Sequence, residues 1–414
     1  MMTGRTTMAD VSVLNVKLYG ETIGTLAHVG SDRTLFSFTA DYIADGNRPT
    51  LGLGFKDQYG QLITELPVKQ KRLLPFFSNL LPEGHLRTYL AGLAGVKQER
   101  EFYLLWALGR DLSGAITVEP VDGEEWPPGL KGDSAEDTGR KRANALRFSL
   151  AGVQLKFPAV QTDQSNKGLT IPASGVGGSW IVKLPSLRFE GLPENEYALL
   201  TLARQIGIDV PKIQLIDVEA IGNLPKGISD LKGQALAVKR FDRTPEGPVH
   251  TEDFAQVFGV YPEKKYDTAS YRNIATVLGA ETGETDVEEL IRRLTFCTLT
   301  GNADMHLKNW SLTYPDKRTP ALSSAYDLVS TIPYIEEENA ALKFARTKRF
   351  DGYTSDELSY LAAKARLPET PVLKTARQTV ERFHEVWEKE KHHLPQRRQV
   401  TERVDAHLNK LRLK

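Results

Sequence analysis

Residues 295–330 read TFCTLTGNADMHLKNWSLTYPDKRTPALSSAYDLVS, and the interpretation of the whole chain starts from this stretch. An apolar run leads into a cluster of hydrogen-bonding side chains, and a second apolar stretch then leads to a lone acid, Asp327. Polar groups packed next to apolar chain need hydrogen-bonding partners or a metal ion. The stretch therefore predicts a polar site at the end of a buried helix. The members of the cluster are Asn302, Asp304, His306, Lys308 and Asn309.

Asp304 and Asn309 have the D-x-x-x-x-N spacing of a protein-kinase catalytic loop. In such a loop the Asp accepts the proton of the attacking hydroxyl, the Asn holds Mg²⁺, and a later Asp holds Mg²⁺ against the β- and γ-phosphates. Mg²⁺ favours this sparse supply of protein ligands, because phosphate and water oxygens complete its shell. The spacing thus favours ATP-dependent phosphoryl transfer. A turn or helix-cap role for Asp304 is the structural alternative.

The composition limits the class of protein. A chain of 414 residues predicts two or three domains, and 40% hydrophobic with 26% charged residues is typical of a globular protein. Basic and acidic residues number 53 each, so the chain is not a polycation built for nucleic acid. The single cysteine, Cys297, excludes an internal disulfide framework, and its apolar setting predicts a buried structural thiol. Without an apolar run of ~18 residues or a signal-peptide core, we expect a cytoplasmic protein with no membrane contact.

Hydrophobic periodicity and composition divide the chain into segments. A disordered start is expected first, followed by an α+β domain, a linker rich in Pro, Gly and charge, an α/β lobe and a mostly helical part. In the last part, TEDFAQVFGV at 251–260 shows helical spacing. The predicted boundaries are 1–10, 11–120, 121–145, 146–243 and 244–414.

A lysine inside an apolar strand is the second candidate site residue. Lys183 lies in WIVKLP at 180–185 and points to the opposite side of the pleat from its apolar neighbours. A buried lysine is rare unless paired, and in kinases such a lysine binds phosphates and pairs with a helix glutamate. Glu196 is the predicted partner because it shares the apolar face of its helix, whereas Glu194 points away. An edge-strand lysine whose amine reaches water is the alternative.

A segment of small residues lies just before that lobe's first strand. In SLAGVQLKF at 149–157, Ala151 and Gly152 could let backbone N–H groups approach a phosphate. An ordinary turn leading into a strand is the alternative. SGVGGS at 174–179 is a rival glycine-rich loop.

The lobe ends in AVKRFDR at 237–243, just before the helical part. In a two-lobed kinase the adenine stacks against this crossing. Phe241 could supply apolar contact there, and the backbone of 239–241 could supply hydrogen bonds. A strand end with Phe241 in the core is the alternative.

Together, in order and spacing, these segments resemble the HipA family of bacterial serine/threonine-kinase toxins. The resemblance covers roughly 11–390, and it implies a two-lobed protein-kinase-like α+β fold with an amino-terminal α+β domain and a mostly helical C-terminal lobe. FFSNLLPEG and LGRDLSGA resemble the family's amino-terminal domain. The other matching segments are SLAGVQLKF, IVKLP, ENEYALLTLA, KRFDR, GNADMHLKN and AYDL.

The resemblance implies a role for each matching residue. Asp304 would be the general base, Asn309 and Asp327 would hold Mg²⁺, and Lys183, oriented by Glu196, would bind the ATP phosphates. Ser149 matches the serine that family members autophosphorylate. Lys239 departs from the family, in which an acidic residue can occur at that position. The nucleotide-binding residues would be Ala151, Gly152, Val153, Gln154, Leu155, Lys156, Lys183, Lys239, Arg240, Phe241, His306, Lys308, Asn309, Tyr326 and Asp327.

The resemblance also implies cofactors and partners. These are ATP and Mg²⁺, a HipB-like helix-turn-helix antitoxin, operator DNA bound through that antitoxin, and a protein substrate, an aminoacyl-tRNA synthetase. A phosphate on Ser149 would add nearly two negative charges to the nucleotide loop, eject the loop and silence the enzyme. A small-molecule or lipid kinase and a catalytically silent co-repressor scaffold are the alternatives.

Overall fold

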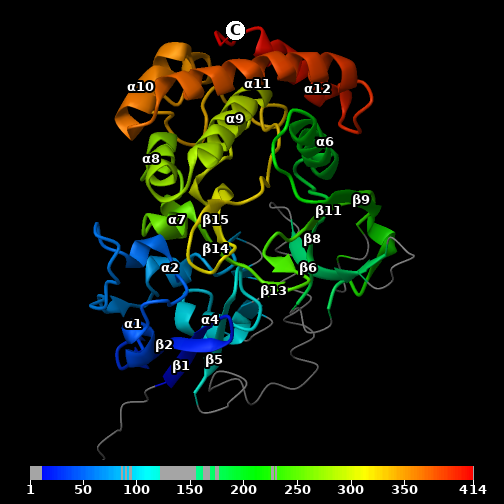
Figure 1. Cartoon of the computed structure of the whole chain (residues 1–414). Coiled ribbons are helices and arrows are strands. Elements are labelled where there is room, and N and C mark those ends of the chain that lie inside the picture. Colours follow the sequence, from blue (N-terminus) through cyan, green and yellow to red (C-terminus); the bar gives the residue numbers. More distant parts are fainter. Residues whose placement is uncertain are drawn as a thin grey trace, which may run out of the picture.

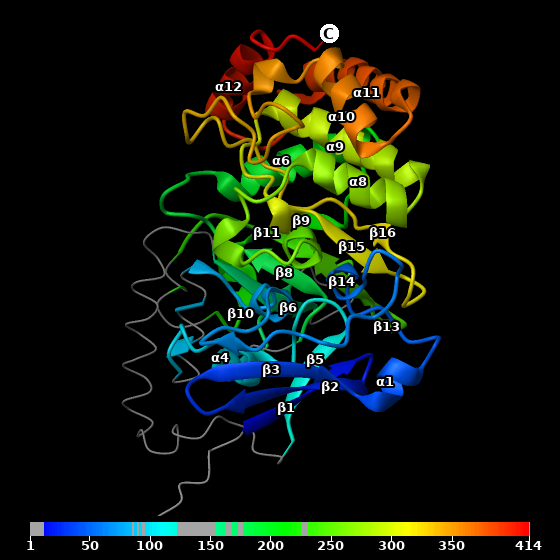
Figure 2. The same ribbon diagram turned by 90° about the vertical axis from the view of Figure 1, so that its left-hand side faces the viewer.

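The computed structural model describes residues 12–84, 87–88, 91–92, 96–121, 155–161, 168–172, 177–224, 228 and 231–413. The predicted start at 1–10 and all but the first residue of the predicted linker at 121–145 lie outside these ranges. Figure 1 shows the amino-terminal part, blue to cyan, at one end and the carboxyl-terminal helices, orange to red, at the other. Figure 2 shows the same arrangement after a quarter turn.

The amino-terminal part is built on a five-stranded antiparallel sheet with the order β4-β3-β2-β1-β5. Every second residue of β1 is buried, which places Leu14, Val16 and Leu18 on the core face. Aromatic rings such as Phe36 and Phe77 fill the space between the sheet and the helices. The described elements are β1 (Ser12–Leu18), β2 (Glu21–Val29), β3 (Arg33–Phe38), α1 (Ala40–Ala44), β4 (Lys69–Gln70), α2 (Pro75–Ser78), α4 (Glu101–Leu108) and β5 (Ile116–Pro120).

A second, six-stranded sheet follows, with the order β10-β7-β6-β8-β11-β9. Strand β8, which carries Lys183, is internal and pairs antiparallel with β6 and β11. The register places Lys156 of β6 directly opposite Lys183, so both side chains leave the same face of the sheet. The elements are β6 (Lys156–Gln161), β7 (Leu169–Thr170), β8 (Trp180–Lys183), α6 (Leu192–Gln205), β9 (Ile213–Asp217), β10 (Ile221–Gly222) and β11 (Gln234–Lys239).

The remaining chain is mainly helical around α9, most of whose residues are buried. Helices α8, α11 and α12 pack against α9, and Gly301, in a left-handed conformation with φ 65°, ends it. Among the helices of the described ranges, none combines the length and the apolar character needed to cross a membrane. The elements are β12 (Arg243–Thr244), β13 (Gly247–Pro248), β14 (His250–Asp253), α7 (Phe254–Val257), α8 (Tyr271–Glu281), α9 (Glu284–Thr300), β15 (Ser311–Tyr314), β16 (Ala321–Leu322), α10 (Ser355–Ala365), α11 (Glu369–Glu390) and α12 (Arg398–Leu408).

The expectation of a helix throughout 251–260 was wrong at its start. Strand β14 covers the first three residues and pairs antiparallel with β15. Helix α7 begins only after Asp253, whose side chain accepts a hydrogen bond from the backbone N–H of Gln256 in a capping box. The partner strand is distant in sequence, so local periodicity could not reveal the pairing.

Helix α6 joins the second sheet to the helical part. Its buried residues Leu199, Leu200 and Leu202 belong to the same hydrophobic core as α9, whereas Val182 of β8 belongs to the sheet's own core. The helix therefore holds Glu196 at the boundary between the two cores.

A buried carboxylate, Glu252 of β14, ties the amino-terminal part to the helical part. It accepts hydrogen bonds from the backbone N–H of Leu53, at 2.8 Å, and from the hydroxyl of Tyr314. Burial raises the pKa of Glu252 to about 7. The folded protein therefore holds a proton on Glu252 at pH values where the unfolded chain has lost it, so stability falls as pH rises from about 4.5 to 7.

We expect Glu252→Gln to flatten this pH dependence. The amide is neutral at every pH and its oxygen can still accept both hydrogen bonds. The variant should match the parent near pH 5 and exceed it by about 2 kcal/mol, a few degrees in Tm, at pH 8. Thermal unfolding of both proteins at the two pH values measures the difference. A variant that is equally destabilised at both would contradict this account.

Candidate active site

Lys183 lies at the end of β8, and its ammonium contacts two carboxylates, Glu196 of α6 and Asp327. Its side chain is 5% exposed, which rules out the alternative of an amine that reaches water. Glu196 is the partner that the helical-face argument selected. Burial alone would lower the pKa of Lys183, but Asp327 and Glu196 outweigh it and hold that pKa above its usual range. The lysine is therefore charged.

A second lysine reaches the same carboxylate from the neighbouring strand. Lys156 Nζ lies 3.0 and 3.2 Å from the two carboxylate oxygens of Asp327. Like charges directly opposite each other on a sheet repel, and Asp327 compensates the pair Lys156–Lys183. Burial opposes ionisation of Asp327, but the two lysines hold its pKa below its usual range. The carboxylate of Asp327 therefore pairs with a lysine from each of two neighbouring strands.

The backbone at Asp327 has an uncommon conformation, with φ 54° in the left-handed region. Asn302 supports it, because its amide nitrogen lies 3.5 Å from the carbonyl oxygen of Asp327. The amide oxygen of Asn302 accepts the backbone N–H of Asp304 at 3.0 Å. Asn302 therefore bridges the two acids. Local strain of this kind is concentrated at functional sites.

Asp304 lies in the turn after α9, as one alternative had it, but it caps no helix. The short 3₁₀ helix that follows, Leu307–Asn309, begins after His306. The carboxylate of Asp304 instead accepts a hydrogen bond of 2.5 Å from the hydroxyl of Tyr266. The carboxylate of Asp304 can therefore accept a hydrogen bond from a hydroxyl group, as the predicted general base would have to do.

His306 lies beside this pair as a neutral imidazole. It is 6% exposed, and burial lowers its pKa to about 4. Its ring meets the Tyr266 ring edge-on at 4.9 Å between centroids. Within the described ranges its Nδ1 has no hydrogen-bond partner. A buried polar atom in this state is costly, so a water molecule or a ligand that hydrogen-bonds to it would be stabilised here.

Asn309 and Asp327, the predicted Mg²⁺ ligands, carry the kinds of oxygen atom that would be needed to hold a divalent cation. Asn309 Nδ2 donates to the carbonyl of Asp304 at 2.8 Å, which leaves its amide oxygen as the acceptor end. The hydroxyl of Tyr326 donates to the carbonyl of Lys308 at 2.8 Å and so holds the two segments together. An amide and a carboxylate oxygen are donors that Mg²⁺ prefers. No three His, Cys, Asp or Glu side chains gather as metal ligands in the described ranges, so phosphate and water would supply the other positions.

Two side chains of the predicted nucleotide site are already committed to protein partners. Lys308 Nζ donates to the backbone and side-chain oxygens of Asn79 at 2.7 and 3.1 Å, and it lies 3.3 Å from Asp253. The guanidinium of Arg240 is bound by Asp111 and Asp242. Both cations therefore hold the site's framework.

The predicted adenine segment runs along the end of β11. The Phe241 ring is half-buried and lies 5.8 Å from the Tyr326 ring, next to Asp327. The backbone N–H of Lys239 donates to the carbonyl of Lys212 and that of Arg240 to the carbonyl of Ser179, both at 2.8 Å. These two N–H groups already donate hydrogen bonds within the protein. Of the contacts predicted for an adenine, those with Phe241 and with the backbone carbonyl groups of 239–241 remain.

The start of the predicted nucleotide loop lies outside the described residues. The loop ends in the described part, where Leu155 is buried and its carbonyl accepts the N–H of Leu184 at 2.9 Å. The predicted loop residues that lie outside the described ranges are Ser149, Ala151, Gly152, Val153 and Gln154.

Cys297 is 4% exposed, and burial raises its pKa to about 12, which confirms a structural thiol.

Sequence reasoning missed Tyr266 and gave Asn302 no role. Tyr266 lies 38 residues before Asp304 in a segment without a motif, so nothing local marks it. Asn302 was visible in the polar cluster, but its bridge to Asp327 depends on the turn after α9. These contacts depend on the packing of distant segments.

Two family profiles match the chain. The HipA-like C-terminal domain matches residues 148–387, and the HipA N-terminal domain matches residues 14–119. "Putative kinase Y4dM" of Sinorhizobium fredii is 59% identical over 97% of each chain. The serine/threonine-protein kinase toxin HipA of Shewanella oneidensis is 27% identical over 67% of each.

A solved structure shows the same fold. It is the complex of HipA, HipB and operator DNA from Shewanella oneidensis MR-1, with a TM-score of 0.71, 21% identity and 96% of each chain covered. At this identity the likeness concerns the fold alone. It confirms the two-lobed kinase-like α+β fold that the sequence predicted.

The charge network predicts unequal costs for its two lysines. Lys183→Met leaves the buried Glu196 without its paired cation and leaves Asp327 with Lys156 alone, so we expect a loss of about 3 kcal/mol. Lys156→Met removes a side chain that is 40% exposed, so we expect less than about 1 kcal/mol. Denaturant unfolding without nucleotide measures both. Equal losses would show that Lys183 is not the centre of the network.

Proposed function

The chain belongs to the HipA family, and we propose that it transfers the γ-phosphate of ATP to a serine or threonine of a protein. One observation carries the proposal. Lys183 and Glu196 come from one lobe, Asp327 comes from the other, and the three meet in one buried charge network. The side chain of Asn302 links the backbone of Asp327 to the backbone of Asp304. These are the parts that phosphoryl transfer requires, since it depends on positioning and on charge stabilisation.

In this proposal each residue has one task. Asp304 accepts the proton of the attacking hydroxyl, and Lys183 binds the ATP phosphates. Asn309 and Asp327 would hold Mg²⁺, which when bound neutralises charge on the β- and γ-phosphates. Phe241 contacts the base.

Nucleotide binding redistributes the charge network. Lys156 and Lys183 both end at Asp327, and both are cations at the place where phosphates would bring negative charge. When the amines turn towards the phosphates, the carboxylate of Asp327 becomes free to act as a ligand. The side chain of Lys156 is 40% exposed and that of Lys183 is 5% exposed, so Lys156 can turn with less rearrangement of its surroundings.

The acceptor hydroxyl has to replace the hydroxyl of Tyr266 on Asp304. Tyr266 is 36% exposed, so it lies where a protein substrate can reach it. The exchange substitutes one O–H···O⁻ hydrogen bond for another, and its net cost is therefore small.

The wider biology is proposed from relatives. The Shewanella oneidensis protein is named a serine/threonine-protein kinase toxin, and the solved structure contains HipB and operator DNA. We extend this to a toxin–antitoxin pair with a HipB-like antitoxin that holds the operator. The family resemblance supports an aminoacyl-tRNA synthetase as the substrate. Labelled ATP offered to lysate proteins and, separately, to metabolites distinguishes a protein kinase from a small-molecule kinase.

Substitution separates the two acids. Asp304→Asn should lower transfer by about 10³-fold with little change in nucleotide binding, because it removes only the base. Asp327→Asn should abolish transfer and also weaken binding of Mg²⁺–ATP. Transfer assays and titration with a fluorescent ATP analogue measure the two effects. Asp316→Asn, an exposed acid on the β15–β16 connection, is the matched control. Undiminished transfer by Asp304→Asn would remove the base assignment.

Autophosphorylation at Ser149 gives a further expected result. After incubation with ATP and Mg²⁺, mass spectrometry should find phosphate on the Ser149 peptide while activity declines, because the added charge repels ATP phosphates. Ser149→Ala should keep its activity over the same period. An unmodified Ser149 peptide in a fully inactivated sample would count against the assignment.

A further inference from the structure

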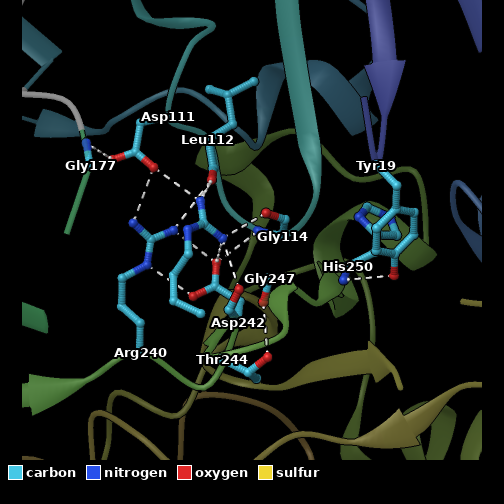
Figure 3. Close-up of polar contacts among 11 residues, drawn as sticks. Tyr19, Asp111, Leu112, Gly114, Gly177, Arg240, Asp242, Thr244, Gly247 and His250 are labelled. Atoms are coloured by element: carbon cyan, nitrogen blue, oxygen red, sulfur yellow. Dashed lines mark hydrogen bonds and ion pairs between the residues drawn. The ribbon is translucent and has the colours of Figure 1, made fainter. Parts of the chain in front are cut away.

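Asp111 of the amino-terminal part reaches into the second sheet. It follows α4 in the LGRDLSGA segment, and its side chain is 10% exposed. One carboxylate oxygen lies 3.3 Å from Arg240 Nη1 and 3.0 Å from Arg243 Nη2. The other accepts the backbone N–H of Gly177 at 2.7 Å. Figure 3 shows these contacts converging from three separate segments.

A second carboxylate completes the cluster. Asp242 lies 2.8 and 2.9 Å from two nitrogens of Arg240 and 2.9 Å from Arg243 Nη1, and it accepts the N–H of Gly114 at 2.9 Å (Figure 3). Burial opposes ionisation of Asp242, yet the two arginines hold its pKa below its usual range. The charges of two arginines and two aspartates therefore cancel within a largely buried cluster. Such clusters hold geometry firmly, because losing one member leaves a buried charge uncompensated.

Backbone carbonyls of the amino-terminal part fix the same arginines. Arg243 donates to the carbonyl of Leu112 at 2.8 Å and to that of Gly114 at 2.7 Å. Arg240 also reaches Leu112 at 3.3 Å. The turn between α4 and β5 therefore accepts hydrogen bonds from residues on both sides of Phe241.

The cluster holds both strands that frame the base position. Arg240 and Asp242 flank Phe241, whose ring faces Tyr326 beside Asp327. Gly177 precedes β8, the strand of Lys183, and the N–H of Arg240 donates to Ser179 in the same stretch. Asp111 therefore fixes the end of β11 relative to the beginning of β8.

We propose that Asp111 is a positioning residue for the nucleotide, through which the amino-terminal domain sets the affinity for the ATP base. This inference rests on the proposed kinase function. Asp111 acts through Arg240 and Arg243 and touches neither the phosphates nor the acceptor. Its loss lets the Phe241 segment move, which weakens binding of the base but leaves Asp304, Lys183 and Asp327 in place. Such a residue changes KM for ATP and leaves kcat nearly unchanged.

The test compares two isosteric substitutions in the full chain. Asp111→Asn removes the charge from the cluster. Glu101→Gln removes a more deeply buried carboxylate of α4 that accepts hydrogen bonds from Leu73, Ser78 and Arg87 inside the amino-terminal part. We expect Asp111→Asn to raise KM for ATP and the Kd of a fluorescent ATP analogue about tenfold, with kcat within twofold. Glu101→Gln should lower Tm and leave KM for ATP and the Kd of the analogue within twofold of the parent values.

Further readouts separate the possible outcomes. Arg243→Gln, which removes a cation of the same cluster, should also raise Kd. The double variant with Asp111→Asn should raise Kd by less than the two single effects combined, because both substitutions disrupt the same cluster. An unchanged Kd in both single variants, or equal effects from Glu101→Gln, would overturn the inference while the kinase function stands. If the parent protein neither binds the analogue nor transfers phosphate, the proposed function itself fails.

Discussion

The site depends on the ion pairs that the buried ammonium of Lys183 forms with two carboxylates. The ammonium lies where β8, α6 and the segment after β16 meet, and each supplies one charge. An ion of this kind is tolerated in the interior only when its partners stay in contact with it. The packing of α6 into the core of the helical part keeps Glu196 in place, so the two lobes are joined by charge as well as by apolar surface.

The amino-terminal domain is part of this construction. Glu252 binds the backbone at Leu53, and Lys308 beside the predicted catalytic residues is held by Asn79. A domain that supplies contacts on both sides of a site influences how rigid that site is. In this chain, polar contacts of this kind connect parts that have separate hydrophobic cores.

Much of the site was visible in the sequence because its residues lie in short motifs on regular elements. Helical geometry selected Glu196 as the partner of Lys183. Strand alternation placed Lys183 on the face opposite its apolar neighbours but left open whether its amine reaches water, and the structure shows that it is buried. Other features depend on contacts between distant segments and leave no local pattern. The pairing of β14 with β15 overrode helical spacing, Tyr266 reached Asp304 from a separate segment, and Arg240 was bound by Asp111. Hydrophobic periodicity indicates which face of a helix or strand a residue occupies, but it does not indicate which distant segment packs against that face.

The register between β6 and β8 sets a rule for how this chain can vary in length. Lys156 and Lys183 share a face only because they are directly opposite each other. Successive residues of a strand alternate between faces, so a deletion of one residue that slid β6 past β8 would turn Lys156 away from Asp327 and bring an apolar neighbour to the charged side. A change in the length of the connection before β6 therefore preserves the lysine pair only where the register between β6 and β8 is kept.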